Sequence, residues 1–421
     1  MSSICIFEDE GFSGLLPIVW FRPVFDLRCG INTLFEKIKR CYPRTNVYLL
    51  CRDYLNARVK KDHPGAFVGK IGKESSVLFI NGRLLCDIET AKKIPASGAD
   101  EIFECNGVVA AARLSKGNLE MVSNSITSPA SKKSFSAVYS TCRVSQVQAR
   151  MIDHFFDIVA SNKGEITSDF AYYTRGGITR GKVHESVATY HHGGIFIDDG
   201  AEVEAFATLD ARNGPVYISK GAKVLPYSRI DGPAFIGERS VITTGANIRG
   251  GVSIGEGCKV GGEVEETVFQ AYSNKAHYGF LGHSYIGEWV NIGAGATNSD
   301  LKNSYGSIKI NYSGSEIDSG KMFLGCCIAD HTKVGIGVLI NTGSVIGAGS
   351  NVFGGGVTQK FIPSFSWGNS HKMIKYDPER AIKTAKIVMG RRDKEMEESD
   401  IDLFRKIYEL TEDERKSCLV V

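Results

Sequence analysis

The sequence has no excess of charge of either sign. It holds 50 lysine and arginine residues against 47 aspartate and glutamate residues, which gives a net charge of +3 over 421 residues. Proteins that bind nucleic acids or anionic membranes usually gather basic residues on one face or in one segment. The balance therefore predicts small molecules and other copies of the chain as partners, with neither nucleic acid nor membrane among them.

The sequence also lacks the cysteine pairs of a disulfide framework. Its 11 cysteines are an odd number, scattered from Cys5 to Cys418 without a Cys-x-x-Cys pair, which is typical of reduced thiols in the cytoplasm. The first residues turn acidic before any apolar run develops, which does not fit a signal peptide. One uncharged stretch, residues 334–359, holds eight glycines, so we expect a repeat there and not a membrane span.

What the sequence does contain is an aliphatic residue at every sixth position. Eight occur in succession, and glycine commonly follows such a residue, as in Ile236-Gly237. The eight are Ile218, Val224, Ile230, Ile236, Ile242, Ile248, Ile254 and Val260, and shorter runs in the same step are Ile197, Val203 and Leu209, Ile286 and Ile292, and Ile328, Val334, Ile340, Ile346 and Val352.

A six-residue step matches neither a helix nor simple strand alternation. It matches a short strand followed by a tight corner, three of which close a triangular coil with one aliphatic side chain per step inside. The pattern predicts a left-handed parallel β-helix, and the 18 steps predict about six coils and a height of roughly 30 Å. The alternative, a glycine-rich sandwich with chance spacing, explains eight successive steps poorly.

Two interruptions break the period, at residues 261–285 and 293–327. We interpret both as loops that project from the rigid coils, where binding groups usually lie. The first holds two of the nine histidines, His277 and His283.

The flanking segments predict two further domains. Residues 1–190 alternate expected strands at residues 47–51 and 77–80 with expected helices at 33–41 and 147–161, which predicts an α/β domain with a mainly parallel sheet. The β-helix is expected over residues 191–370. Asp377 and Pro378 predict the start of a helix, so residues 371–421 are expected to form a C-terminal helical cap over the open end of the β-helix.

Histidine is the side chain best suited to act as a base at neutral pH, and His277 is the first candidate. It follows Lys275 in the first interruption, and Gly279 would allow close approach of the backbone. The alternative for His277 is a solvent-exposed loop histidine without a catalytic role. His283 and His331 are weaker candidates, and the three imidazoles from adjacent subunits form an alternative metal site, although no carboxylate is obviously placed to orient them.

Arg249 is a long cation at a corner of small polar residues. It predicts either a phosphate ligand or a solvated charge.

These residues resemble the bifunctional N-acetylglucosamine-1-phosphate uridylyltransferase/glucosamine-1-phosphate N-acetyltransferase family, in particular its short divergent branch. The motifs that carry the resemblance are Lys275-Ala276-His277, Leu281-Gly282, Ile286-Gly287 and Asn291-Ile292-Gly293-Ala294-Gly295. The resemblance implies acetyl transfer from acetyl-CoA to a hexosamine phosphate. It implies His277 as the general base and, as substrate-binding residues, Arg249, Lys275, Tyr285, Asn291 and Asn298. It also implies a homotrimer with active sites between the β-helices.

One departure within the repeat concerns charge. Glu265 and Glu266 stand where the larger enzymes carry a lysine pair, so the acceptor sugar is held differently or is a different sugar.

The N-terminal domain resembles the sugar nucleotidyltransferase fold of the same branch. The likeness rests on Phe7-Glu8-Asp9, on the run from Arg22 to Gly30 and on Asn81-Gly82-Arg83. The glycine-rich loop that cradles nucleotide phosphates in ordinary members is missing, as is an evident Gly-Asp pair for Mg²⁺. Arg22 and Arg28 are candidate phosphate ligands and Asp26 a candidate for Mg²⁺, and a purely structural network of these residues remains the alternative.

Three hypotheses for function remain open from the sequence. The first is an N-acetyltransferase coupled to nucleotidyl transfer that forms a nucleotide sugar. The second keeps nucleotidyl transfer alone, with the β-helix as a trimerisation domain. The third is a non-catalytic regulatory or scaffold subunit.

Overall fold

The structure is a computed structural model that describes residues 3–126, 129–174 and 176–418. The chain divides into two compact units. The first comprises residues 3–27 and 32–154, and the second comprises the short segment 28–31 together with the rest of the chain from Phe155. No helix among the described residues is both long and apolar enough to cross a membrane.

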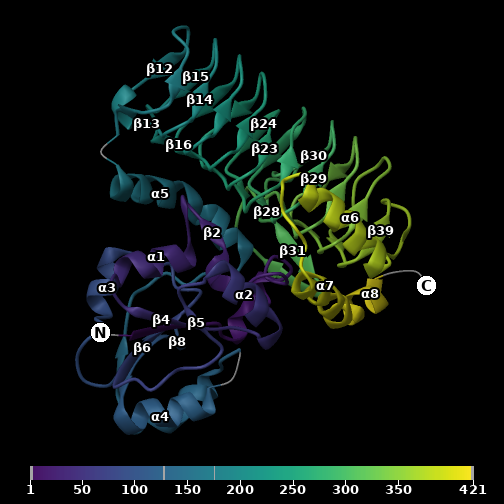
Figure 1. Cartoon of the computed structure of the whole chain (residues 1–421). Coiled ribbons are helices and arrows are strands. Elements are labelled where there is room, and N and C mark those ends of the chain that lie inside the picture. Colours follow the sequence, from purple (N-terminus) through teal and green to yellow (C-terminus); the bar gives the residue numbers. More distant parts are fainter. Residues whose placement is uncertain (1–2, 127–128, 175, 419–421) are drawn as a thin grey trace. The chain divides into compact units, whose positions relative to one another are not determined.

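The first unit contains a seven-stranded sheet in the order β5-β4-β1-β6-β8-β7-β9 (Figure 1). Only β8 runs against its neighbours, which confirms the mainly parallel α/β prediction. In sheet order the strands are Phe67–Val68, Asn46–Leu50, Ser3–Phe7, Ser76–Asn81, Val108–Ser115, Glu101–Cys105 and Arg143–Gln146, and the helices are α1 (Leu34–Cys41), α2 (Asn56–Asp62), α3 (Ile88–Lys93) and α4 (Lys116–Ser125).

The expected helix at residues 147–161 differs in the structure. Residues 147–152 are extended, and the backbone N–H of Val147 and of Ile152 donate to Glu104 and Arg83 of the first unit. Helix α5 begins only at Phe155, runs to Tyr173 and belongs to the second unit. The first compact unit therefore ends at His154, whereas the sequence predicts a domain that ends at residue 190. The apolar pattern misleads here because a short apolar run is compatible with either a helix or an extended segment.

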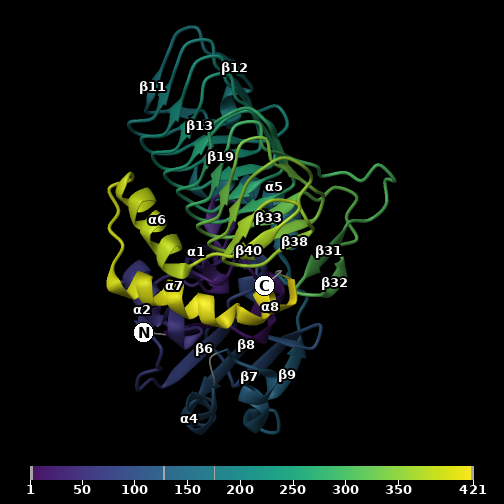
Figure 2. The ribbon, with the colours of Figure 1, turned by 90° about the vertical axis from the view of Figure 1, so that its right-hand side faces the viewer.

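The second unit is built on parallel strands wound into three sheets, the three faces of a β-helix (Figures 1 and 2). The first face has ten strands: β10 (Ile178–Thr179), β13 (Ile195–Ile197), β16 (Val216–Ile218), β19 (Ala234–Ile236), β22 (Val252–Ile254), β25 (Val268–Phe269), β28 (Tyr285–Ile286), β33 (Cys326–Ile328), β36 (Ser344–Ile346) and β38 (Phe361–Ile362).

The second face has eleven strands, of which the last is antiparallel. They are β11 (Lys182–Val183), β14 (Glu202–Val203), β17 (Lys223–Val224), β20 (Val241–Ile242), β23 (Lys259–Val260), β26 (Asn274–Lys275), β29 (Asn291–Ile292), β34 (Lys333–Val334), β37 (Asn351–Val352), β39 (Ser366–Gly368) and β40 (Met373–Lys375).

The third face comprises β12 (Ala188–Tyr190), β15 (Thr208–Asp210), β18 (Arg229–Asp231), β21 (Asn247–Ile248), β24 (Glu263–Glu265) and β27 (Phe280–Gly282). A separate strand pair, β30 (Thr297–Asn298) and β35 (Leu339–Ile340), follows it along the chain. All eight aliphatic residues of the main run lie in the hydrophobic core, together with those of the shorter runs. The six-residue period and the left-handed β-helix are therefore confirmed.

The first expected loop is wrong. Residues 261–285 continue the coils as β24 to β27, and their interior positions are Val264, Phe269, Lys275 and Leu281. The step shortens to four and five residues before it returns to six, and one interior position is a lysine. Neither feature fits a pattern of aliphatic residues at a fixed step. The sequence pattern therefore predicts about six coils, whereas the first face has ten strands.

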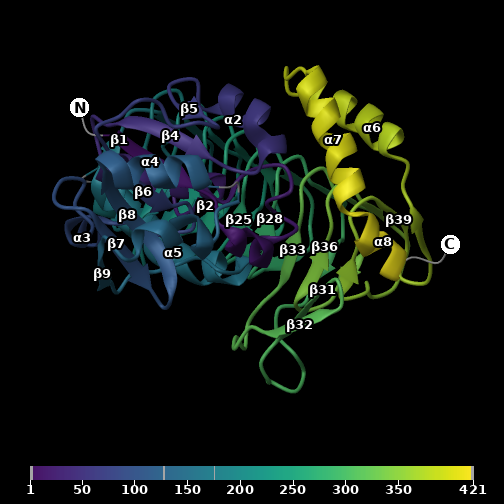
Figure 3. The same ribbon diagram turned by 90° about the horizontal axis from the view of Figure 1, so that it is seen from below.

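The second interruption does leave the coils, after β30. It includes the antiparallel hairpin of β31 (Lys309–Tyr312) and β32 (Ser315–Asp318), which projects from the β-helix in Figures 2 and 3.

The C-terminal residues fold into helices as predicted. Asp377 accepts a hydrogen bond from the backbone N–H of Glu379 at 2.8 Å and so caps α6 (Pro378–Gly390). The two helices that follow are α7 (Glu398–Leu410) and α8 (Glu412–Cys418), and α6 and α7 lie side by side in Figure 3. Phe404 of α7 meets the rings of His331 and Phe365 at corners of late coils, which anchors the helices on the β-helix.

Candidate functional site

A cavity of about 400 Å³ lies on the second face of the β-helix, beside the C-terminal end of α6. Strands β23, β26 and β29 form its floor. The residues that line it are Lys259, Tyr272, Asn274, Ala276, His277, Asn291, Ile292, Gly293, Ala294, Ile336, Val388, Arg391 and Arg392. Two residues singled out in the sequence, His277 and Asn291, are thus brought together.

The cavity wall is basic. Lys259, Arg391 and Arg392 contribute three cations, and none of the described residues that line the cavity is a carboxylate. Arg392 is held in place because its guanidinium donates to the Asn274 side chain at 2.6 Å. An anionic group such as a phosphate is the ligand that such a wall attracts. Arg391 and Arg392 belong to no motif in the sequence. The one signal for them is their place directly after an amphipathic helix, where basic side chains are favoured.

His277 occupies the corner between the second and third faces, and its side chain is exposed. Three consecutive carbonyl groups hold this corner. The carbonyl of Ala276 accepts from the Thr243 hydroxyl at 3.1 Å, that of His277 from Lys275, and that of Tyr278 from the backbone N–H of Gly295 at 3.0 Å. The imidazole itself has no hydrogen-bond or ion-pair partner among the described residues, so it is available to a substrate.

Lys275 does not reach the cavity. Its side chain occupies an interior position of the coil, and the residue is 1% exposed. Its ammonium donates to the carbonyls of Gly261 at 3.0 Å and His277 at 2.9 Å. Burial lowers the pKa of Lys275 to about 8.

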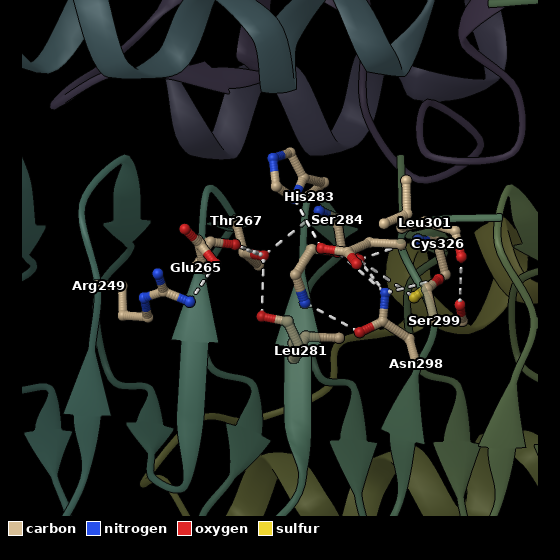
Figure 4. A network of polar contacts seen from close by, with 12 residues as sticks. Arg249, Glu265, Thr267, Leu281, His283, Ser284, Asn298, Ser299, Leu301 and Cys326 are labelled. Carbon is tan, nitrogen blue, oxygen red and sulfur yellow. Dashed lines mark hydrogen bonds and ion pairs between the residues drawn. The ribbon is translucent and has the colours of Figure 1, made fainter. Parts of the chain in front are cut away.

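Two other predicted substrate ligands are also turned away from the cavity. The Tyr285 hydroxyl is buried against Gln270 at 2.5 Å and accepts from the backbone N–H of Arg28. The Asn298 amide lies within the coil, where it accepts from the N–H of Gly282 and donates to its carbonyl, both at 2.9 Å (Figure 4). Only the family resemblance predicts these two residues as substrate ligands.

Arg249 lies on the third face, outside the cavity (Figure 4). Its guanidinium pairs with Glu265 at 2.7 Å and with Glu263 at 3.4 Å, and its side chain is half-exposed. Glu266 pairs with Lys163 of α5 at 3.0 Å. The two glutamates that replace the lysine pair of the larger enzymes are therefore both neutralised by cations of this chain.

The three histidines lie at three different corners of the coil, so within one chain they do not meet. His283 occupies the corner between the third and first faces, and His331 the corner between the first and second. The imidazole of His283, which is labelled in Figure 4, hydrogen-bonds to Asp300 at 2.8 Å. The expectation that no carboxylate orients these histidines is thus wrong for His283. A local motif does not show this contact, because Asp300 comes from the next coil.

A second cavity, of about 240 Å³, lies within the first unit at the carboxyl end of β1. Ligands of open α/β sheets bind at this edge. Its lining includes Asp9, Glu10, Arg83 and Lys132. Asp9 is bound by Arg83 at 2.7 Å and by Asn81 at 2.8 Å, so the Phe7-Glu8-Asp9 and Asn81-Gly82-Arg83 motifs come together here.

The predicted nucleotide-binding residues do not line this cavity. Asp26 is bonded to His63 at 2.8 Å. Burial raises the pKa of Asp26, although the bond to His63 opposes this. Burial also acts to lower the pKa of His63, but the bond to Asp26 together with the charges of the nearby carboxylates raises it. Arg22 is buried. The Arg28 guanidinium donates to the carbonyls of Gln270 and Ile31 and lies over the ring of Phe235, all within the second unit.

These contacts bear on the expected magnesium ion. Asp26 does not fit a metal ligand as it is folded, because its side chain is only 15% exposed and its carboxylate is already bonded to His63. The described residues also contain no group of three or more histidine, cysteine, aspartate or glutamate side chains able to hold a metal ion.

Known proteins resemble parts of this chain. Residues 4–178 match the family described as sugar nucleotidyl transferase. A bifunctional sugar-1-phosphate nucleotidylyltransferase/acetyltransferase of Sulfurisphaera tokodaii is 37% identical over 98 residues, which cover 23% of this chain and 24% of that protein. The bifunctional protein GlmU of Bordetella parapertussis is 30% identical over 168 residues, or 38% of this chain and 34% of that one.

Among solved structures, a UDP-N-acetylglucosamine acyltransferase covers 55% of this chain and 82% of its own, with 14% identity and a TM-score of 0.21. The segments that match the bifunctional proteins of Sulfurisphaera tokodaii and Bordetella parapertussis span about a quarter to a third of the length of those two proteins. The expected resemblance to the bifunctional nucleotidyltransferase/acetyltransferase family is confirmed.

Proposed function

We propose that the chain is an acetyl-CoA-dependent N-acetyltransferase that acts on a hexosamine phosphate and is coupled to nucleotidyl transfer, which forms a nucleotide sugar. The observation that carries the proposal is the cavity that places His277 and Asn291 beside three cations. The similarity to relatives named for both activities supports it.

The reaction needs few protein groups. The amine of the sugar attacks the thioester carbonyl, the C–N bond forms, the C–S bond breaks, and coenzyme A leaves as the thiol. The His277 imidazole takes the proton that the amine loses. We infer that Asn291 hydrogen-bonds a substrate and that the basic wall binds phosphate, and the exposure of Asn291 and the three cations of the wall support this.

Arg249 remains the proposed ligand of the sugar phosphate, and it implies more than one subunit. It lies on the third face, whereas Asn291 lies on the second. A single substrate that touches both residues needs two β-helices side by side, as in a homotrimer with its sites between subunits. Glu265 would have to release Arg249 when the phosphate binds.

The nucleotidyl half is proposed for the first unit, with its cavity at the carboxyl end of β1 as the site. Mg²⁺ stays a prediction for this half alone. A cytoplasmic location also stays a prediction.

The test is a pair of assays on the purified chain. Thiol release is measured with acetyl-CoA and glucosamine 1-phosphate, and pyrophosphate release with UTP and the acetylated sugar phosphate. His277→Ala should lower thiol release by at least about a hundredfold, because a general base contributes about 10² to 10⁴ in rate. Pyrophosphate release and the circular dichroism spectrum should not change.

His283→Ala and His331→Ala are the matched controls, and each should cost about tenfold or less. Loss of thiol release in His283→Ala with full activity in His277→Ala would transfer the role of base to the His283 and Asp300 pair. Pyrophosphate release without any thiol release would favour a nucleotidyltransferase with a trimerising β-helix. A chain that shows neither reaction over a panel of nucleotides and sugar phosphates would be a scaffold subunit.

A further inference from the structure

We propose that Lys275 is a positioning residue for the acetyl-transfer reaction, because its buried ammonium fixes the backbone of His277 and so the place of the imidazole at the cavity. The inference rests on the proposed role of His277 as the general base.

The place of Lys275 in the coil is unusual for a charged side chain. It pairs in register with Val260 of the preceding coil, and Val260 pairs with Ile242. On the other side its strand pairs with β29, whose interior residue is Ile292. Lys275 thus replaces one aliphatic residue in a column of aliphatic residues, and it is 1% exposed.

The Lys275 ammonium donates hydrogen bonds to two backbone carbonyl groups. One is the carbonyl of His277 itself, at 2.9 Å. The other is that of Gly261, at 3.0 Å. Gly262 makes room for this arrangement, since a Cβ atom there would lie 2.8 Å from both the ammonium and the His277 carbonyl. Gly262 also has a φ of +70°, which other residues rarely adopt.

A buried charge of this kind does not serve stability alone. Removal of an ammonium from water is costly, and an apolar side chain of similar length would fill the interior without that cost. Its contribution is the anchoring of a corner whose neighbouring carbonyls are also anchored, by Thr243 and by Gly295. Because the imidazole has no partner of its own among the described residues, its precision depends on this backbone.

The chain offers a matched control in Lys333. Its ammonium also donates to two backbone carbonyls, those of Trp289 at 2.7 Å and His331 at 2.9 Å. Burial lowers its pKa as well, to about 7. The carbonyls that it holds belong to another corner and not to the corner of His277.

The experiment compares Lys275→Met with Lys333→Met in the full chain. Lys275→Met should lower kcat for acetyl transfer by about ten- to a hundredfold, because a small misplacement of a catalytic group has effects of this size. The KM for acetyl-CoA should change by less than about twofold, since Lys275 touches no substrate. Lys333→Met should keep kcat within about twofold of the wild type.

A double variant separates positioning from a general structural role. If Lys275 acts through His277, then Lys275→Met adds less than about twofold to the loss already caused by His277→Ala. Independent losses that multiply, or a full kcat in Lys275→Met, would overturn the inference. If the methionine variant does not fold, Lys275→Leu gives the same comparison, because leucine is apolar and also lacks a donor for the two carbonyl groups.

Failure of the inference differs from failure of the proposed function. Full acetyl transfer in His277→Ala removes the base from this corner whatever Lys275 does. A normal His277→Ala defect with no Lys275→Met defect leaves the function in place and assigns Lys275 to packing.

Discussion

Two lysines of the β-helix keep their ammonium groups away from water, Lys275 in the interior of the coil and Lys333 beside Trp289 and His331. Desolvation disfavours the charged form, and it lowers their pKa values to about 8 and about 7. A group whose pKa is lower in the folded chain than in the unfolded chain binds fewer protons when folded. The free energy of unfolding should therefore rise with pH between these pKa values and that of an unfolded lysine.

This linkage gives a prediction for Lys275. Between about pH 8 and pH 10.5 the wild type should gain stability relative to Lys275→Met by an amount on the order of 3 kcal/mol. Below about pH 8 the difference between the two proteins should be constant, because the lysine is protonated in both states. Urea titrations at a series of pH values measure this, and a difference that stays flat up to pH 10.5 would show that the ammonium reaches water.

Lys275 shows that a sequence motif does not determine the direction of a side chain. The motif placed Lys275 next to His277 but did not tell that its side chain points into the coil. The spacing argument failed at the same residue, because it searched for aliphatic interior positions only.

Helix α6 contributes to the candidate site as an element. Its last turn supplies Val388 to the cavity wall, and Arg391 and Arg392 of the wall follow directly after its last residue, Gly390. The helix begins at a capped N-terminus, where Asp377 and Pro378 fix its first turn. The sequence predicted this helix and its start, and the structure shows where its end lies.

The basic wall gives a prediction for the donor substrate. Arg391→Ala should raise the KM for acetyl-CoA by about tenfold and leave kcat within about twofold, because a lost charged hydrogen bond to phosphate weakens ground-state and transition-state binding alike. Arg380→Ala removes the same charge from the other end of α6, outside the cavity, and should change neither constant. Equal effects of the two variants would mean that only the overall charge of the helix matters.

Some strands of the β-helix could be predicted from the sequence and others could not. Every aliphatic residue of the six-residue period lies in the interior, so the strands with that period could be predicted. Strands β24 to β27 could not, because the steps that lead to β24 and β25 are shorter by two and one residues and a lysine occupies the interior position of β26. The start of α5 could not either, since hydrogen bonds to Glu104 and Arg83 keep the preceding residues extended.

For the whole molecule, the distribution of Arg249 and His277 over different parts of the coil predicts shared active sites. Arg249→Ala and His277→Ala should each be nearly inactive alone. When the two are unfolded, mixed in equal amounts and refolded, about a quarter of the sites should combine intact residues from two subunits and regain activity. Light scattering should show a trimer, and a stable monomer at micromolar concentration, or mixing without any gain, would contradict shared sites.

The sequence by itself determined the β-helix, the α/β class of the first unit, the capped helix after Asp377 and the resemblance to a bifunctional transferase family. These follow from local rules, since a six-residue period, strand and helix alternation and a capping pair are each written in neighbouring residues. It also identified His277 and Asn291, which line the cavity.

Only the tertiary structure decided which of the other residues accompany them. Arg391 and Arg392 are more than 90 positions from Asn291, and Asp300 reaches His283 from the next coil. The inward direction of Lys275 and of Asn298, and the capture of Arg28 by Gln270, depend on how successive coils stack. Contacts of this kind arise from the shape of the folded chain, and no short segment of the sequence records them.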